Sequence, residues 1–348
     1  MRILSKPSTA TCTLPMYVSY LLAEPKRASC VRLGETISIS HDSITRMLNR
    51  ENYTPRDLFI EVKDEIVLTG GTVSVDDAVL DKPYSKLIPF VQNFWSGKHH
   101  RVVLGANLIT LFYTDTNGVR VPVNFRLYDP ADHKTKNDYF REMVTEVLSW
   151  GLKPAWVTGD SWYSGLENLK FIKNNGMGFL FAIKQNRILS QTRGKNTAAA
   201  YLNIPIQIGT EVYLPKFGYV TVYRTYFKNE VRHYIGYSPN QPQGTPLPIS
   251  VFETLHSHHY AIEQYHRILK QVCHIEHFSM RNKTAVSNHI FCAIFAYVQL
   301  EMAKVKNIIS NAYEIQRTLF FEVVAKFIQT HATQMPFINA HPRPAVNA

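Results

Sequence analysis

Cysteine is scarce in this sequence, with only four among 348 residues. They are Cys12, Cys30, Cys273 and Cys292. No two have the CxxC spacing of zinc or redox sites, so we expect free thiols in a reducing compartment. The longest apolar helix candidate, residues 290–300, is too short to span a bilayer, and the N-terminus lacks the apolar region of a signal peptide. These absences predict a cytoplasmic protein that has no membrane partner.

Acidic residues are also in short supply relative to basic ones. Asp and Glu number 27 against 38 Lys and Arg, which gives a formal charge of +11. Such an excess favours a polyanionic partner, and nucleic acid before membrane. Hydrophobic residues make up 45% of the chain, which excludes a disordered protein. Residues 1–65 are nearly neutral, so almost all of the excess charge lies in 66–348.

Residues 1–65 have the pattern of a helical N-terminal region. Three short amphipathic segments follow one another, and the second has Ser40 or Asp42 as its N-cap residue. The third begins with Pro55 at a favoured first-turn position. Several short helices before a main domain fit a helix-turn-helix that binds DNA. They equally fit a packing subdomain, and the near-neutral charge does not decide between the two.

Beyond residue 65 the hydrophobic period changes to that of an α/β domain. Predicted strands cover 65–79, ending on Asp76 and Asp77, then 102–113, 119–127, 153–160 and 177–183, with helices at 138–150 and 161–176. The first three strands are expected to be antiparallel and the later ones parallel. We therefore predict a mixed sheet with helices on both faces, formed by 66–187 and 251–283.

Three further regions complete the predicted domain organisation. Residues 188–250 contain short β-rich runs separated by Pro, Gly and Gln, which indicates a small β insertion. Residues 284–335 are expected to be helical, with one helix over 286–306 and another over 308–330. Residues 336–348 contain three prolines and are expected to form a loose tail.

Residues 254–283 contain a helix with one carboxylate on a basic face. Its apolar residues recur at spacings of three and four, and Glu263 shares a face with His259, Arg267 and Lys270. Taken alone, this pattern fits a solvated face with an i,i+4 ion pair between Glu263 and Arg267. It also fits a metal-binding carboxylate beside an anionic polymer.

Glu263 gains significance from two aspartates elsewhere in the chain. Asp76 and Asp160 are predicted at the carboxyl ends of neighbouring strands, where open α/β sheets bind ligands. Three converging carboxylates suit a hard divalent cation, so we expect Asp76, Asp160 and Glu263 to bind two Mg²⁺ (or Mn²⁺) ions that act on a phosphodiester.

Basic and aromatic residues near the three acids suit a DNA substrate. Lys184, Arg187, Arg267 and Lys270 would contact phosphates. Trp162, two residues after Asp160, is placed either to stack on an extruded base or to be a partly buried core residue. A rival reading is a zinc site, although its residues lack the usual ligand spacing. Its candidate ligands are His256, His258, His259, Cys273, His274 and His277.

Three motifs together resemble a known family. VDDAVLDKPYSK, VTGDSWYS and AIEQYHRILKQ followed by FSMR are similar to DDE transposases of bacterial insertion sequences, in the IS4-like group and nearest its IS701 type. The likeness covers about residues 18–304. It implies an RNase H-like core with a β insertion before the glutamate, and a metal-binding triad of Asp76, Asp160 and Glu263. Lys270 matches the lysine seven positions after the family's glutamate.

The sequence departs from the family pattern at three positions. Ala78 stands where the family has Thr after its first acid, so Asp77 remains an alternative to Asp76. His256 and His259 replace the family's Tyr and Arg, although His259 can still hydrogen-bond a phosphate.

The resemblance implies cut-and-paste transposition: phosphodiester hydrolysis and strand transfer on double-stranded DNA, at element ends and target. It also implies a homodimer in the DNA complex, within the bacterial nucleoid. Two alternatives stay open. One is a decayed or repurposed DNA-binding protein, and the other is an RNase H-like nuclease without transposition.

Overall fold

The computed structural model describes residues 10–334 apart from 86, 98, 193, 229 and 320, so the predicted tail at 336–348 lies outside the described residues. The helices are α1 (Leu14–Ala23), α2 (Cys30–Ile37), α3 (His41–Arg50), α4 (Pro55–Val62), α5 (Lys136–Ser149), α6 (Leu166–Asn174), α7 (Ile249–Gln271), α8 (Lys283–Val305), α9 (Glu314–Leu319) and α10 (Phe321–Gln334). The strands are β1 (Thr72–Asp81), β2 (Val91–Ser96), β3 (Arg101–Thr114), β4 (Arg120–Leu127), β5 (Trp156–Gly159), β6 (Gly178–Ile183), β7 (Ile188–Leu189), β8 (Thr197–Ala198), β9 (Thr210–Leu214), β10 (Gly218–Phe227) and β11 (Glu230–Tyr237).

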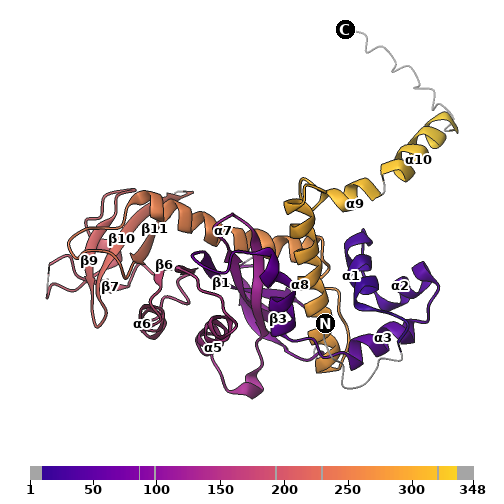
Figure 1. Cartoon of the computed structure of the whole chain (residues 1–348), viewed down its shortest axis with the longest axis horizontal. Helices are drawn as coiled ribbons and strands as arrows, with labels where there is room; N and C mark the ends of the chain where they lie inside the picture. Colours follow the sequence, from indigo (N-terminus) through magenta and orange to yellow (C-terminus); the bar gives the residue numbers. More distant parts are fainter. Residues whose placement is uncertain are drawn as a thin grey trace, which may run out of the picture.

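Two N-terminal helices begin where the sequence predicts. Of the two predicted caps, Ser40 caps α3 by accepting a hydrogen bond from the Asp42 amide, and α4 begins at Pro55, with Thr54 and Asp57 forming a capping box. These helices pack beside α8 at one end of the molecule (Figure 1).

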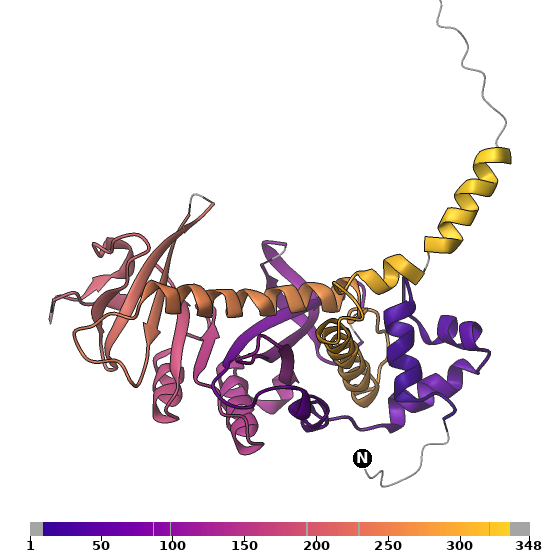
Figure 2. The same cartoon turned by 45° about the horizontal axis from the view of Figure 1, so that its top comes forward.

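The main sheet has the mixed topology that the sequence predicts. Its strand order is β2-β3-β1-β5-β6-β11-β10-β9, and β4 pairs with the second half of β3. β3 runs antiparallel to both β1 and β4, whereas β1, β5 and β6 run parallel. Figure 2 shows α7 along one face and α5 and α6 beneath the other. The predicted mixed sheet with helices on both faces is therefore confirmed.

The first part of this sheet differs from the sequence prediction at two strands. β1 does not end on Asp76 and Asp77 but continues to Asp81, because Ala78 and Leu80 are buried and the strand stays paired with β3 as far as Asp81↔Gly105. β2 was not predicted. It forms because residues 91–96 pair with the first half of β3, a partner that the local sequence does not reveal.

The predicted β insertion extends the main sheet instead of forming a separate unit. β11 pairs antiparallel with β6, and β10 and β9 follow outward, so the sheet continues beyond the parallel strands. α7 then leads from the insertion back toward the N-terminal helices (Figure 2).

The helix predicted over 308–330 begins later than expected. Residues 306–313 form no helix, and Ser310 bonds the Glu314 carboxylate in a turn before α9 and α10. No helix within the described residues combines the length and apolar character needed to cross a membrane.

Candidate active site

The register of two parallel strands brings Asp76 and Asp160 together. The pairing of β1 with β5 ends at Val75↔Gly159. Asp76 directly follows Val75, and Asp160 directly follows Gly159. Gly159 permits this close packing, since a Cβ atom there would lie 2.6 Å from the Phe181 side chain and 2.8 Å from that of Val75. The prediction that Asp160 follows a strand neighbouring the first is confirmed.

The carboxyl group of Asp160 resists ionisation. Burial raises its pKa to about 7, and the negative charges of Asp76 and then Asp77 add to the effect. The backbone amide of Trp162 donates a 2.8 Å hydrogen bond to Oδ1, which opposes the rise without cancelling it. Asp160 therefore sits in a concentration of negative charge that the surrounding residues leave uncompensated.

Asp77 points to the α5 face of the sheet, where other side chains satisfy it. Its Oδ2 accepts hydrogen bonds from Lys136 Nζ at 2.7 Å and Asn107 Nδ2 at 2.6 Å. Its Oδ1 accepts one from the Tyr163 hydroxyl at 3.2 Å. The ion pair with Lys136 is largely shielded from water, so Asp77 has a structural partner of opposite charge.

Asp76 points to the α7 face, as the alternation of side chains along a strand requires. Its Oδ2 lies 3.5 Å from His266 Nδ1. Burial alone would raise the pKa of Asp76, but the hydrogen bond and charge of His266 and the charge of His259 outweigh it, and the pKa is lowered. Asp76 is thus held in its ionised form on the face where α7 lies.

Glu263 lies on α7, close enough to Asp76 for the two charges to interact. Loss of hydration raises its pKa, and the charge of Asp76 raises it further. Arg232 on β11 and then His266 and Arg267 on α7 act in the opposite direction. Asp76 is therefore the one acid of the predicted set whose charge acts on both Asp160 and Glu263.

The donor chemistry of these three acids fits a divalent cation. Carboxylate oxygens are the ligands that Mg²⁺ and Mn²⁺ prefer, and the raised pKa values of Asp160 and Glu263 arise partly from mutual repulsion that a cation would relieve. Within the described residues, no group of three or more His, Cys, Asp or Glu side chains is already gathered closely enough to hold an ion. The electrostatics thus fit a metal, while the side chains are not closed around one.

Two predicted phosphate ligands on α7 differ in availability. Arg267 is exposed to solvent beside Glu263. Lys270 instead donates a 2.6 Å hydrogen bond to the Val79 carbonyl and lies 3.1 Å from the Glu276 carboxylate. Lys270 therefore fastens α7 to β1, and its ammonium group is already occupied.

The other predicted DNA contacts lie beyond the carboxyl ends of β5 and β6. Lys184 is exposed after β6, and Arg187 is partly buried, which lowers its pKa. Trp162 is 55% exposed, so the alternative of a partly buried core tryptophan does not hold. Its ring lies 5.4 Å from Lys136 Nζ, close to the aspartates and open to solvent.

The histidines proposed as zinc ligands have different neighbours and do not converge on one point. His256 bonds the Tyr234 hydroxyl at 3.2 Å, and His258 bonds the Thr72 hydroxyl at 2.9 Å. His259 lies near Asp76, and His274 and His277 bond each other at 2.9 Å. The described residues offer no cluster that could bind zinc.

Sequence reasoning missed three residues that surround the acids. His266 lies three positions after Glu263 on the same helix face, which was a usable signal. Arg232 arrives from β11 and Lys136 from the start of α5, and no local pattern connects either residue with the acids.

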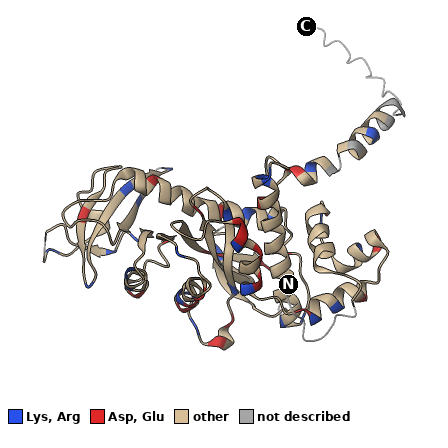
Figure 3. Cartoon of the chain, viewed as in Figure 1, with Lys and Arg blue, Asp and Glu red and all other residues tan. Residues whose placement is uncertain are grey.

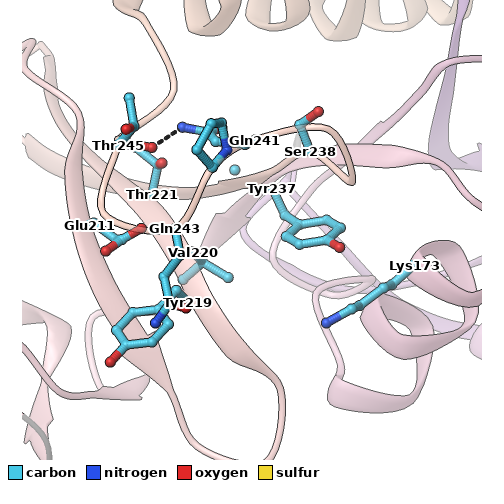
Figure 4. Close-up of a pocket in the computed structure, with 12 residues that line it drawn as sticks. Lys173, Glu211, Tyr219, Val220, Thr221, Tyr237, Ser238, Gln241, Gln243 and Thr245 are labelled. Atoms are coloured by element: carbon cyan, nitrogen blue, oxygen red, sulfur yellow. Dashed lines mark hydrogen bonds between the residues drawn. The ribbon is translucent and has the colours of Figure 1, made fainter.

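Two cavities lie away from the carboxylates. Figure 4 shows an open pocket of about 160 Å³ on the insertion, lined by residues that include Lys173, Glu211 and Tyr237. A second, of about 600 Å³, lies beside the amino-terminal end of β1 and is lined by residues that include Asp115 and His258. None of the three predicted catalytic acids lines either cavity.

Comparison with known proteins adds a family match. The family model described as a transposase DDE domain matches residues 86–299, which is more than half of the chain. The match includes Asp160 and Glu263 and begins after Asp76 and Asp77. No curated protein sequence matches the chain.

Two similar solved structures are nucleic-acid complexes of transposases. One is the piggyBac transposase synaptic complex with hairpin DNA, at 11% identity and a TM-score of 0.46, covering 94% of this chain and 72% of that one. The other is the Drosophila P element transposase strand transfer complex, at 10% identity and a TM-score of 0.28, covering 54% of this chain and 48% of that one.

Proposed function

Because the chain belongs to the family of DDE transposases, which are DNA-cleaving enzymes, we propose that Asp76, Asp160 and Glu263 are its three catalytic carboxylates. One observation carries the assignment of the first acid. The charge of Asp76 raises the pKa of both Asp160 and Glu263, whereas Asp77 acts on Asp160 and is itself paired with Lys136. Asp76 is therefore the acid that links the other two.

The proposed cofactor is a pair of Mg²⁺ or Mn²⁺ ions held by these carboxylates. When bound, such ions neutralise the clustered charge and activate the attacking and leaving oxygens of a phosphodiester. The ionised Asp76 offers a ready anionic ligand, and a bound cation would favour the charged form of Asp160 and oppose the rise in the pKa of Glu263.

The proposed reaction has two steps at the same acids. In the first, a water oxygen bonds to phosphorus at the element's end, and the bond to the 3′-oxygen breaks to leave a free 3′-OH and a 5′-phosphate. In the second, that 3′-OH bonds to a phosphorus of target DNA and displaces the target's own 3′-oxygen. Neither step needs a covalent enzyme intermediate, so the protein's contribution is positioning and charge neutralisation.

The surrounding side chains would position the DNA. Arg267 and Arg232 flank Glu263 with positive charge, and Lys184 and Arg187 follow β6. Their phosphate contacts would be salt-dependent and largely independent of sequence. The exposed Trp162 ring is placed to stack on a base next to Asp160.

The position of His259 bears on whether this chain is active. It lies near Asp76 on the same face, and burial lowers its pKa, so at neutral pH it would contact a phosphate as a neutral hydrogen-bond donor. A decayed, non-catalytic DNA-binding protein is the first alternative to an active enzyme. A nuclease that cuts without strand transfer is the second.

The finer identity follows the sequence resemblance. We propose an IS4-like transposase of the IS701 type that acts as a homodimer bridging two DNA ends in the bacterial nucleoid. The main sheet, the insertion before α7 and the basic surface are compatible with this identity.

A metal-dependent cleavage assay tests the proposal. The purified chain is incubated with duplex DNA carrying the ends of its own genetic element, with Mg²⁺, Mn²⁺ or EDTA. We expect nicking that requires the metal, followed by joining to target DNA. Asp160→Asn and Glu263→Gln should each abolish both products while leaving DNA binding in EDTA unchanged.

Each contrary outcome selects an alternative. Full cleavage by either variant would refute the assigned carboxylates. Binding without metal-dependent cleavage would favour the decayed protein, and cleavage of any duplex without joining would favour the nuclease.

A further inference from the structure

β2 and β3 form a hairpin that projects from the main sheet. Residues 91–96 pair with residues 101–106 of β3, whereas the pairing of β3 with β1 begins only at Gly105. The end of the hairpin therefore extends past the end of β1, and Figure 2 shows it in purple, rising past α7. We call residues 91–106 the β2–β3 arm.

Side-chain contacts on one face hold this arm in place. On the α5 face, the Phe94 ring packs edge-on against Tyr128 with 5.8 Å between the ring centres, and it lies 5.9 Å from the Lys136 ammonium group. Near the turn, His99 bonds the Asp81 carboxylate at 2.9 Å. The arm is therefore a fixed projection of the sheet that can keep its shape against a partner.

The opposite face of the arm exposes an apolar pair. Trp95 and Val102 lie directly opposite each other in the hairpin, and they are 66% and 59% exposed. Side chains alternate along β3, so Val102 lies on the same face as Thr110, the residue that pairs with Asp76. The pair therefore faces the α7 side of the sheet, as Asp76 does. A partner that covered both side chains would gain the free energy of burying them.

The arm belongs to a stretch of sequence without acidic residues. Figure 3 shows Lys and Arg in the insertion, the core and the terminal helices, so basic residues alone do not mark a binding surface. Between Asp81 and Asp115, however, the sequence has four basic residues and no Asp or Glu. Arg101 and His100 from this stretch are exposed at the end of the arm. This charge attracts a polyanion and repels a second copy of a chain that carries +11.

The arm lies at a distance from the acids that one duplex can span. Val102 is eight residues from Thr110 along β3, which is about 26 Å at about 3.3 Å per residue. The same length of duplex DNA contains roughly eight base pairs. A duplex that lies at Asp76 and follows the α7 side of β3 would therefore present a groove to Trp95. Minor grooves accept apolar wedges between base steps, and each such insertion bends the duplex.

We propose that the β2–β3 arm inserts Trp95, backed by Val102, as a wedge into the minor groove of duplex DNA, roughly eight base pairs from the cleaved phosphate. Arg101 contacts the adjacent phosphate. The wedge unstacks one base step and bends the duplex toward the major groove. It therefore favours the easily deformed steps TA and CA at a place where no base edge is read. This inference rests on the proposed function for the position of the cleaved phosphate.

Chemical probing of unstacked bases tests the wedge without cleavage. The full chain is bound in EDTA to a series of element-end duplexes in which a TA step is moved one base pair at a time. Permanganate then oxidises thymines that have lost their stacking. We expect one hyperreactive step at roughly eight base pairs from the cleaved phosphate. Trp95→Ala should remove this signal, and Trp95→Phe should retain part of it.

Affinity measurements separate the wedge from the charge beside it. Contact between one base and an aromatic ring contributes at least roughly fivefold to affinity, so Trp95→Ala should lose that factor without changing the salt dependence. Arg101→Ala should instead reduce the slope of log affinity against log salt by about one. Tyr201→Ala is the matched control, because it removes an aromatic ring that is 83% exposed on the insertion, and it should change neither quantity.

Each contrary outcome refutes a different statement. A hyperreactive step that survives Trp95→Ala, or equal affinity of this variant and the unmodified chain, would overturn the wedge. A smaller sedimentation mass of the DNA-free Trp95→Ala protein would overturn it too, and would assign the apolar pair to contact between two copies. A Trp95-dependent step without cleavage on adding Mg²⁺ would refute the proposed catalysis alone, and cleavage without any such step would refute the wedge alone.

Discussion

Asp76 and Asp77 are neighbours on β1, but their carboxylates lie on opposite faces of that strand and have different partners there. On the α5 face, Asp77 has an ammonium group, an amide and a hydroxyl within hydrogen-bond reach. On the α7 face, Asp76 accepts a 2.8 Å hydrogen bond from the Asp77 backbone amide and has the His266 ring at 3.5 Å, and two more carboxylates lie within its electrostatic influence. One face compensates its buried charge, and the other accumulates it.

This difference supports the proposal that Asp76, and not Asp77, is the first catalytic acid. A carboxylate paired with Lys136 strengthens the connection between β1 and α5 and has little left to offer a ligand. A group of acids that raise one another's pKa is costly to maintain without a cation, and such perturbation is concentrated at functional sites. The comparison leads to four predictions, taken from the largest expected effect to the smallest.

Replacing each aspartate with asparagine should give the largest difference in cleavage rate between the two faces of β1. Asp76→Asn should reduce metal-dependent cleavage by roughly a thousandfold or more, because a metal site contributes several kcal/mol to the transition state. Asp77→Asn keeps hydrogen bonds to Asn107 and Tyr163 and should lose less than roughly tenfold. Single-turnover cleavage of end-sequence DNA measures both, and the reverse order would transfer the catalytic role to Asp77.

The sequence predicted this site only as far as its residue types and strand order. Asp160 follows β5 as expected, because a short apolar run ending in Gly-Asp leaves few other possibilities. The pair Asp76–Asp77 looked like the end of a strand, since adjacent acids usually belong to turns. Only the pairing of β1 with β3 shows that the strand continues and that the two acids face opposite sides.

The remaining errors have the same physical origin. β2 forms through pairing with β3, and β11 joins the main sheet through pairing with β6, so both depend on partners distant in sequence. Lys136 and Arg232 reach the acids from separate elements and carry no local signal. Helix caps such as Ser40 and Thr54 were predictable because their hydrogen bonds are made within three residues.

Removing the Lys136 ammonium group should leave the Asp77 carboxylate on the α5 face without a positive charge beside it. Lys136→Met leaves Asp77 without its charged partner, and we expect the free energy of unfolding to fall by about 2 to 3 kcal/mol. Urea denaturation at neutral pH measures the change. The Asp77→Asn/Lys136→Met double variant is the control and should recover part of the loss. Equal stability of all three proteins would show that the Asp77–Lys136 pair is not structural.

The clustered acids on the α7 face should make the metal-free protein lose stability as the pH rises from acidic to neutral. The pKa of Asp160 is raised to about 7 in the folded chain, against about 4 in an unfolded one. The folded state therefore binds the additional proton between these values, and stability is lost as pH rises from about 4 through 7. We expect a loss of a few kcal/mol over this range in EDTA, since one pKa unit corresponds to about 1.4 kcal/mol.

Asp160→Asn removes that titration and provides the control. Its metal-free stability should change little between pH 5 and 8 and should exceed that of the unmodified chain at pH 8. Added Mg²⁺ should stabilise only the unmodified chain. If thermal unfolding of the two proteins showed the same pH dependence, the raised pKa of Asp160 would not reflect a real concentration of charge.

The smallest expected effect comes from His266, which makes the largest contribution to lowering the pKa of Asp76. His266 lowers the pKa of Asp76 through its hydrogen bond and charge, so His266→Asn should raise that pKa and move the acidic limb of the cleavage rate to higher pH. At pH 8 the rate should fall only a few-fold, because Asp76 would still be ionised. His258→Asn is the matched control, since His258 also connects α7 to β1, through Thr72, but lies away from the acids. The same shift in both variants would mean that the position of α7, and not the His266–Asp76 contact, determines the pKa of Asp76.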